Sequence, residues 1–455
     1  MMNRKRITIL RDGFINGHKK VVYWMQGAQR VEDNHALIRA IDYANHHHMD
    51  LVVVFNVVPN YPEANERHYA FMLEGINEVI HSCADHQIPF KVTFGQVVDN
   101  VLKETEDAQA LIMDQAYLNI TKQWRQTLVS ALPKSIHVEE IDTDLIVPVK
   151  HASQKVEYGA YTIRKKLHQQ LEACLDLIPL PSYNGSYLAY TIEPLDIQAI
   201  IEEHGVSKRV KKTIHFKGGF SEAKQRLNRF IEEKANDYPD RNEPGKHITS
   251  TLSPYIHFGQ ISTQRIIVAC KDALSKGIIH EAAYDAIVEQ VFVRRELAFN
   301  YTYYNPGYDQ FETMTEPWAY LTMEHHQDDY RPHLYTKDQL EKADTHDPYF
   351  NAAMDEMRFS GYMHNYMRMY WAKKIIEWSN SYKEAYETTL YLNNKYFLDG
   401  RDPNSYTSVA WNYGRHDRAW TERPILGKLR YMNDKGLERK FDMSKYIQYV
   451  ESIKK

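Results

Sequence analysis

The sequence predicts a two-domain protein in which an α/β domain with a doubly wound parallel sheet precedes an all-α domain. Short apolar runs alternate with amphipathic segments over the first 150 residues, whereas helical periodicity dominates after about residue 205. The chain has 455 residues, 43% of them hydrophobic, which is enough for two packed cores. We therefore expect domains at residues 1–149 and 206–455, joined by a connection at residues 150–205.

Five apolar runs of strand length lie in the first 150 residues. They are VVYW from Val21, LVVVFNVV from Leu51, FKVTF from Phe90, ALIMD from Ala110 and IHVEEID from Ile136. Helix-length amphipathic segments at residues 32–47 and 65–82 separate the first three runs. Unbroken apolar runs are typical of strands that helices cover on both faces, which predicts a parallel sheet. Such sheets commonly bind nucleotides at their carboxyl edge, although neither GxGxxG nor a Walker sequence is present.

The pattern loosens between residues 150 and 205. Turn residues gather in PLPSYNGS at residues 179–186, and no long strand is indicated, so we interpret this part as the interdomain connection. Helical periodicity then returns in four segments, punctuated by SP, NPG and DP turns. These segments predict an all-helical second domain, and they lie at residues 221–234, 260–274, 281–304 and 351–377.

Composition narrows the possible partners. A net charge of -4 and a pI of about 6.6 argue against a uniformly basic nucleic-acid binder, so any nucleic-acid contact must be local. An ordinary solvated surface explains the KRVKK run equally well. The basic residues that could form a local contact are Lys208, Arg209, Lys211 and Lys212, the pair Arg294 and Arg295, and Arg415, Arg418, Arg423, Lys428 and Arg430.

Cysteine spacing and hydropathy indicate the compartment. Cys83, Cys174 and Cys270 form no CxxC pair, so neither a disulfide framework nor a zinc site is indicated, and we expect no metal. The first apolar run has four residues, which is too short for a secretory signal. No stretch approaches the ~20 apolar residues of a membrane span. We therefore expect a cytoplasmic protein.

The densest aromatic stretch is FNAAMDEMRFSGYMHNYMRMYWAKKIIEW at residues 350–378. Trp371 and Trp378 are seven residues apart, which puts both on one face of a helix, about 10 Å apart along its axis. Aromatic residues at this spacing are more often core residues. However, Arg368 lies in the same apolar segment, and a buried arginine needs a carboxylate partner, for which Asp399 is the candidate.

A series of motifs runs through nearly the whole chain. They are VVYWMQGAQRVEDNHAL, SQKVEYGAYTIRKKL, TSTLSPYIHFGQIS, RREL with YYNPGYD, THDP, GYMHNYMRMYWAKKIIEW, LNNKYFLDGRDPN and HDRAW. In this order they resemble the class II cyclobutane pyrimidine dimer photolyases, within the photolyase/cryptochrome superfamily. The resemblance implies light-dependent repair of damaged DNA, in which photoexcited reduced FAD passes an electron to a flipped-out pyrimidine dimer. The helical domain would then bind both FAD and DNA.

The resemblance also implies which residues hold the FAD. Arg368 and Asp399 match the ion pair beside the flavin ring, and Asn393 matches the asparagine that faces flavin N5. Asp402 belongs to the same site. Judged locally, Asn393 is equally well explained as a helix-end residue, and the TSTLS run is better explained as a helix cap. The residues that match the phosphate-binding run are Thr249, Ser250, Thr251, Leu252 and Ser253.

For the substrate, Glu296 in RREL matches the active-site glutamate. Desolvation would raise its pKa, and the protonated carboxyl could donate to a pyrimidine carbonyl. Its alternative role is a salt bridge to Arg294 or Arg295. The apolar and stacking walls against the thymine rings are assigned to Met369 and Trp411, a polar contact to Asn365, and DNA contacts to Arg415, Arg418 and Arg423.

One departure from the family concerns flavin photoreduction. Phe350 stands where related sequences have the middle tryptophan of the chain that includes Trp371 and Trp378. Phenylalanine is much harder to oxidise than tryptophan, so it cannot serve as an ordinary hopping station. We therefore predict that photoreduction is slowed or rerouted, while repair by already reduced flavin survives. The residues that could reroute it are Tyr349, Tyr370 and Tyr335.

The motifs leave a second pigment and the biological role open. A deazaflavin or folate antenna is possible in this family, but Ala28, His35 and Phe299 depart from its usual residues. One alternative function is a cryptochrome-like photoreceptor without repair activity. Another, which ignores the resemblance, is a colourless nucleotide-binding α/β domain joined to helices. We expect a monomer without a protein partner, associated with the nucleoid when bound to DNA.

Overall fold

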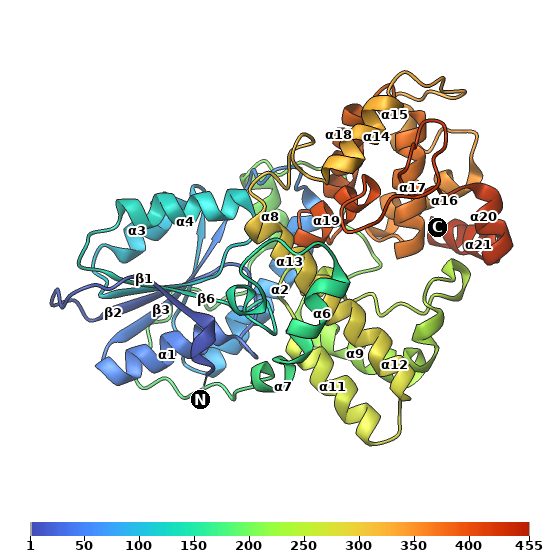
Figure 1. Cartoon of the computed structure of the whole chain (residues 1–455). Helices are drawn as coiled ribbons and strands as arrows, with labels where there is room; N and C mark the ends of the chain where they lie inside the picture. The colour runs from blue at the N-terminus through green and yellow to red at the C-terminus, as the bar shows by residue number, and fades with distance from the viewer. Residues whose placement is uncertain (1, 455) are drawn as a thin grey trace.

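A six-stranded sheet forms the centre of the N-terminal domain in the computed structural model, which describes residues 2–454 (Figure 1). The strand order is β1-β6-β5-β2-β3-β4, and strands β2 to β6 are parallel to one another. The five predicted runs are these five strands. The strands are β1 Ile7–Arg11, β2 Lys20–Met25, β3 Asp50–Val57, β4 Phe90–Phe94, β5 Ala110–Asp114 and β6 His137–Ile141.

Strand β1 was not predicted from the sequence. It pairs with β6 in the antiparallel direction at the edge of the sheet, so the sheet is mixed rather than purely parallel. Its residues are half-buried or exposed, and Ile9 is 57% exposed. An edge strand that is not covered on both faces lacks the unbroken apolar run by which the other five were recognised.

Helices cover both faces of the sheet, which confirms the doubly wound prediction. Val21 and Tyr23 of β2 pack under α1 and α2, whereas Val22 and Trp24 pack on the opposite face against α3 and α4. This alternation follows from the two-residue period of a strand. The four helices are α1 His35–His47, α2 Glu66–Asp85, α3 Val97–Thr105 and α4 Asn119–Ala131.

The connection at residues 150–205 is ordered and returns to the sheet. Thr191 N donates to Phe90 O over 3.0 Å, which lays the connection along the outer edge of β4. Ile200 and Ile201 are buried in the core under α1 and α2. The connection also carries four short helices, α5 Val149–Ala152, α6 Ala160–His168, α7 Leu171–Cys174 and α8 Ile197–Glu203.

The second domain is helical, as predicted, but two predicted segments differ from simple α-helices. The segment 281–304 is one continuous helix with a π-helical middle: α12 Glu281–Val288, η4 Glu289–Arg294 and α13 Arg295–Tyr304. The segment 351–377 is broken into α16 Pro348–Ser360 and α17 Asn365–Trp378. Gly361 ends α16 in the left-handed conformation, with φ of 80°, and its N–H bonds to Met357 O.

The remaining helices complete the second domain and its links. They are η1 Arg4–Arg6, α9 Phe220–Glu233, η2 Ala235–Asp240, η3 Pro244–Lys246, α10 Ser253–His257, α11 Thr263–Ser275, α14 Pro317–His325, α15 Lys337–Glu341, α18 Tyr382–Tyr396, α19 Pro403–Asn412, α20 Asp434–Lys440 and α21 Met443–Ile453.

Arg67 of α2 joins the two domains at the break between α16 and α17. It is buried, and its guanidinium donates to Met357 O over 3.1 Å and to Tyr396 O over 2.9 Å. These carbonyls lie in the last turns of α16 and α18, where a helix leaves carbonyls short of partners, and Met357 O also accepts from Gly361 N. A Cβ on Gly361 would lie only 3.2 Å from Arg67 Cδ, so the glycine leaves room for the arginine.

None of the helices among residues 2–454 is both long enough and apolar enough to cross a membrane. Within the same residues, no three histidine, cysteine or acidic side chains gather as metal ligands would. The three cysteines are buried and unpaired with one another.

Candidate functional site

The helical domain encloses a cavity of about 490 Å³, which we call the larger cavity. It lies where the loop before α10 meets helices α17, α18 and α19. Most of the predicted cofactor and substrate residues line it, although they come from distant parts of the chain. These are Thr249, Ser250, Thr251, Leu252, Ser253, Asn365, Arg368, Met369, Trp371, Asn393, Asp399, Asp402 and Trp411.

One end of the larger cavity is rich in hydroxyl groups. Thr249 Oγ1 accepts from Tyr362 Oη over 3.1 Å, and Thr251 Oγ1 accepts from Arg226 Nη1 over 3.2 Å. Thr251 has a φ of 55°, a left-handed conformation that costs a non-glycine residue ~1–3 kcal/mol. The hydroxyls of Thr249 and Thr251 lie near the cation of Arg226, and this combination suits an anionic group such as a phosphate.

Arg368 and Asp399 form the predicted ion pair at the side of the larger cavity. Arg368 Nη1 and Nη2 donate to the two oxygens of Asp399 over 3.0 and 3.1 Å, in the bidentate geometry that fixes both planes. The guanidinium also lies 3.9 Å from the centre of the Phe397 ring and donates through Nε to Met363 O. The cavity wall therefore carries a positive group of fixed orientation.

Four residues that line the larger cavity have a buried polar atom without a hydrogen-bond partner within residues 2–454. The atoms are Arg295 Nε, Trp371 Nε1, Asn412 Oδ1 and His416 Nε2. An unsatisfied buried polar atom costs ~1–3 kcal/mol, so a polar ligand in the cavity would relieve this cost. With the hydroxyl run and the Arg368 pair, these donors and acceptors fit a flavin with its diphosphate.

The other side of the larger cavity presents a stacking surface. Two cations lie near Trp411, with Arg430 5.0 Å and Lys373 6.0 Å from its ring centre. Lys373 is buried and donates to the carbonyl of Asn412; burial lowers its pKa to about 7. Together with Met369, this surface suits a flat apolar ring held against a polar environment.

Gln290 lines the larger cavity and was missed by sequence reasoning. It belongs to the π-helical segment η4, as does Arg294, which was considered only for DNA contact or for pairing with Glu296. A π-turn shifts side chains away from the 3.6-residue positions on which helical periodicity depends. The only signal in the sequence is the segment's place just before RREL.

Glu296 is not among the residues that line the larger cavity, although its neighbours Arg295 and Leu297 are, and its contact with substrate stays a prediction. The side chain is 2% exposed, and Oε1 accepts from Ile146 N over 2.6 Å and from Val147 N over 3.2 Å. It does not pair with Arg294, which instead binds Glu289. Burial raises the pKa of Glu296 to about 8. Its observed role is to fasten α13 to the loop after β6.

Trp378 lies further along α17 than Trp371 and does not line the larger cavity. Its ring centre is 5.2 Å from that of the buried Phe350 and 5.4 Å from that of Tyr335. Tyr335 Oη hydrogen-bonds to His346 Nδ1 over 2.6 Å. Of the three tyrosines considered for rerouting, Tyr335 is the one in ring contact with Trp378.

The predicted basic contacts divide into free and paired groups. Arg418 is exposed and lies over Trp420, and Arg423 is exposed and lies over Tyr431. Arg415 is instead buried and paired with Glu316, so the structure does not support its predicted DNA contact. The three lysines of the KRVKK run are paired with glutamates, through Lys208–Glu202, Lys211–Glu66 and Lys212–Glu74.

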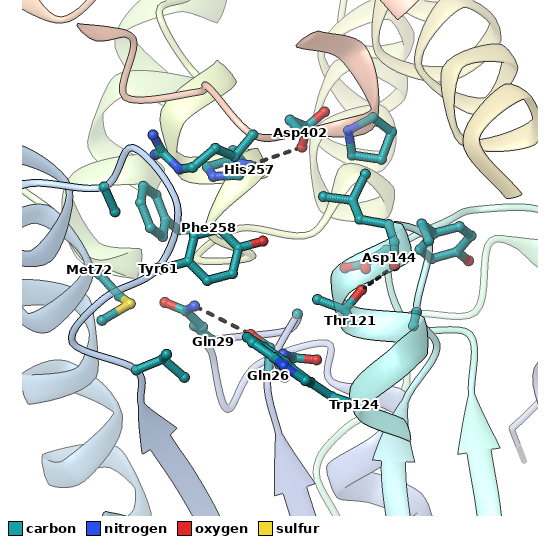
Figure 2. A pocket seen from close by; sticks show the side chains of 18 of the residues that line it. Gln26, Gln29, Tyr61, Met72, Thr121, Trp124, Asp144, His257, Phe258 and Asp402 are labelled. Atoms are coloured by element: carbon teal, nitrogen blue, oxygen red, sulfur yellow. Dashed lines mark hydrogen bonds and ion pairs between the residues drawn. The ribbon is translucent and has the colours of Figure 1, made fainter. Parts of the chain in front are cut away.

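A second cavity of about 220 Å³ opens at the carboxyl edge of the sheet (Figure 2). Gln26 and Gln29 follow β2, Tyr61 follows β3, and Trp124 lies on α4. The far wall comes from the helical domain and includes His257, whose Nδ1 lies 3.0 Å from Asp402 Oδ2. His257 and Asp402 line the larger cavity as well, so the two cavities share this wall.

An α/β domain joined to a helical domain that encloses an anion-binding, aromatic-lined cavity is the architecture of DNA photolyases. The family model described as DNA photolyase matches residues 21–183. A class III photolyase from Agrobacterium tumefaciens superposes with a TM-score of 0.72 at 16% identity, over 96% of this chain and 87% of that one. A photolyase from Sulfolobus tokodaii, solved with two FAD molecules, superposes with a TM-score of 0.70 at 15% identity, over 94% of this chain and 89% of that one.

Sequence similarity extends this result along the whole chain. The deoxyribodipyrimidine photo-lyase of Methanothermobacter thermautotrophicus is 38% identical over 435 residues, 95% of each chain. That of Potorous tridactylus is 38% identical over 454 residues, 98% of this chain and 85% of that protein. The chain therefore belongs to the family of deoxyribodipyrimidine photo-lyases. The predicted superfamily, fold and enzyme class are confirmed, whereas the assignment to class II stays a prediction.

The buried position of Glu296 predicts a pH-dependent stability. Its pKa is about 8 in the folded protein and ~4.3 in an unfolded chain, so between these values the folded state holds a proton that the unfolded state releases. The contribution of Glu296 to the free energy of unfolding must then fall as pH rises through this window. Glutamine does not titrate and can still accept from Ile146 N. We expect Glu296→Gln to gain stability relative to the parent protein as pH rises, measured by urea unfolding. A difference that is constant with pH would contradict this assignment.

Proposed function

We propose that this protein repairs cyclobutane pyrimidine dimers in DNA by light-driven electron transfer, with FAD bound in the larger cavity. The observation that carries the proposal is the cavity itself, in which a fixed Arg368–Asp399 pair and a hydroxyl-rich end lie beside the Met369 and Trp411 wall. FAD, when bound and reduced, would supply the photoexcited electron donor. The motifs quoted above favour class II within the family.

The residues of the chain have separate tasks in this proposal. Thr249 and Thr251 bind the phosphates, and Arg368 orients the ring and offsets negative charge on it. Trp411 and Met369 hold the dimer by stacking and apolar contact, and the helical walls exclude water. Arg418 and Arg423 are exposed and available to DNA phosphates, which explains how a chain with a net charge of -4 can bind DNA locally.

The second cavity suits an antenna pigment of deazaflavin or folate type. Its lining combines the rings of Tyr61 and Trp124 with the amides of Gln26 and Gln29 (Figure 2). The shared wall of His257 and Asp402 brings such a pigment close to the larger cavity, as energy transfer requires. Of the three departures from the family, only Phe299 lines this cavity, whereas His35 bonds to Asp176 and Ala28 donates to Asp114.

Repair itself tests the proposed function. We expect a duplex oligonucleotide with one thymine dimer to regain intact thymines when incubated with the reduced protein under blue light, and to remain damaged in darkness. The measurement is chromatographic separation of the two oligonucleotides. A protein that binds flavin but repairs nothing would instead favour a cryptochrome-like photoreceptor. A protein that takes up no flavin would contradict the proposal as a whole.

The Arg368–Asp399 pair predicts how flavin binding responds to substitution. Asp399→Ala leaves the guanidinium without its bidentate partner, and hydrogen bonds to charged groups contribute ~1.5–3 kcal/mol. We expect flavin affinity to fall by about tenfold or more, measured as visible flavin absorbance per protein after gel filtration. The matched control is Asp338→Ala, which removes an exposed pair with Lys342 and should change nothing. Equal losses in both variants would show that Asp399 has no special role.

The contact between Phe350 and Trp378 predicts slow photoreduction of oxidised flavin. Phe350→Trp should restore an oxidisable ring between Trp371 and Trp378, and flavin bleaching under light with an external reductant should become several-fold faster. Phe350→Leu, which is equally hard to oxidise, should bleach at the parent rate. Repair by chemically reduced protein should be the same in all three. Bleaching of the parent protein as fast as that of Phe350→Trp would refute the prediction.

A further inference from the structure

Two neighbouring tyrosines at the start of α6 are exposed to solvent. Tyr158 is 40% exposed and Tyr161 is 68% exposed, and their ring centres lie 6.1 Å apart with an angle of 62° between the planes. Single exposed aromatic side chains are ordinary on protein surfaces.

The pair lies at the rim of the larger cavity. Tyr158 O accepts from Nδ1 of His416, a residue of the cavity wall, over 2.7 Å, and Tyr158 Oη donates to Asp417 O over 3.3 Å. A Cβ placed on Gly159 would lie 3.4 Å from the Tyr161 ring and 3.8 Å from the carbonyl oxygen of His416. The Tyr161 ring is thus separated from the cavity rim by one glycine.

Helix α6 brings positive charge to the same rim. Arg164 and Arg294 bind the same carboxylate, that of Glu289, over 2.9 and 2.8 Å, and Arg294 lines the larger cavity. Lys165, the next residue of α6, is exposed. This second link between α6 and the cavity is independent of the tyrosine contacts.

Asp417 connects the α6 surface to the aromatic and cationic group on the C-terminal loop. Its backbone carbonyl accepts from Tyr158, while its carboxylate accepts from Arg430 over 2.9 Å and from Trp420 Nε1 over 3.3 Å. Arg430 in turn lies over Trp411. One rim therefore carries aromatic rings and cations from two distant parts of the chain, with Asp417 between them.

We propose that Tyr158, Tyr161 and Lys165 form a second DNA contact, which we call the α6 platform. Exposed rings cannot stack on paired bases inside a duplex, but they can stack on bases that have lost their partners. Flipping a dimer out of the helix leaves such bases in the opposite strand. The α6 platform receives one of them on Tyr161, while Lys165 contacts a phosphate. This proposal rests on the proposed function.

The test uses the full, flavin-loaded protein and a duplex with one thymine dimer and 2-aminopurine opposite it. Base stacking on an aromatic residue contributes ~1–3 kcal/mol, so Tyr161→Ala should bind this duplex at least about fivefold more weakly. In the complex, 2-aminopurine fluorescence should rise because the stacking partner is lost. Tyr161→Phe keeps the ring and should match the parent protein. The control is Tyr187→Ala, which removes another tyrosine of 40% exposure, on the connection beside the sheet.

A second variant measures the charge contribution. A plot of log affinity against log salt concentration has a negative slope. Lys165→Ala should make this slope less negative by about 0.9, as expected for one lost phosphate contact. Its control, Lys208→Ala, removes a lysine already paired with Glu202 and should leave the slope unchanged.

The outcomes separate this proposal from the proposed function. If the parent protein does not prefer the damaged duplex and repairs nothing, the proposed function fails. If the parent protein binds and repairs the dimer but Tyr161→Ala and Lys165→Ala match it in affinity, fluorescence and salt slope, only the α6 platform is overturned. Unchanged flavin absorbance in each variant excludes misfolding as the cause of a loss.

Discussion

The burial of Arg67 at the domain junction is the constraint on which the site depends. A buried guanidinium must have its donors satisfied, and the carbonyl ends of α16 and α18 need donors. Arg67 meets both needs at one point, because it donates to carbonyls in the last turns of both helices. Helix α17, which carries Arg368 and Trp371, begins directly after this junction. Arg67 therefore ties the α/β domain to the chain segment that leads into the wall of the larger cavity.

Much of the fold could be predicted because burial leaves a readable pattern. Strands β2 to β6 are covered on both faces and appear as unbroken apolar runs. The elements that escaped prediction are those whose residues are only half covered, such as β1, or which are short and turn-rich, such as α5 to α8. The break at Gly361 was not predicted because apolar residues continue on both sides of it. The spacing of apolar residues does not show that the chain changes from one helix axis to another.

A contact in the site could be predicted from the sequence where the chemistry of one side chain requires a particular kind of partner. The Arg368–Asp399 contact follows from the need of a half-buried guanidinium for a carboxylate, whatever the path of the chain between them. The direction of a helical side chain is a different matter. Glu296 and Arg415 are the right types of residue near the right place, but Glu296 faces backbone amides and Arg415 faces Glu316. The π-helical turn of η4, which directs Gln290 into the cavity, has no counterpart in simple periodicity.

Substitutions in the wall formed by His257 and Asp402 would affect both cavities. Both side chains face two chambers at once, and Asp402 also caps α19. A natural variant or an engineered change at Asp402 would therefore disturb both cavities and the start of α19 together. A change at His257 would disturb both cavities. The two cavities can be tested separately by substituting residues that line only one of them. Trp124 lines only the second cavity, and Asn393 lines only the larger cavity.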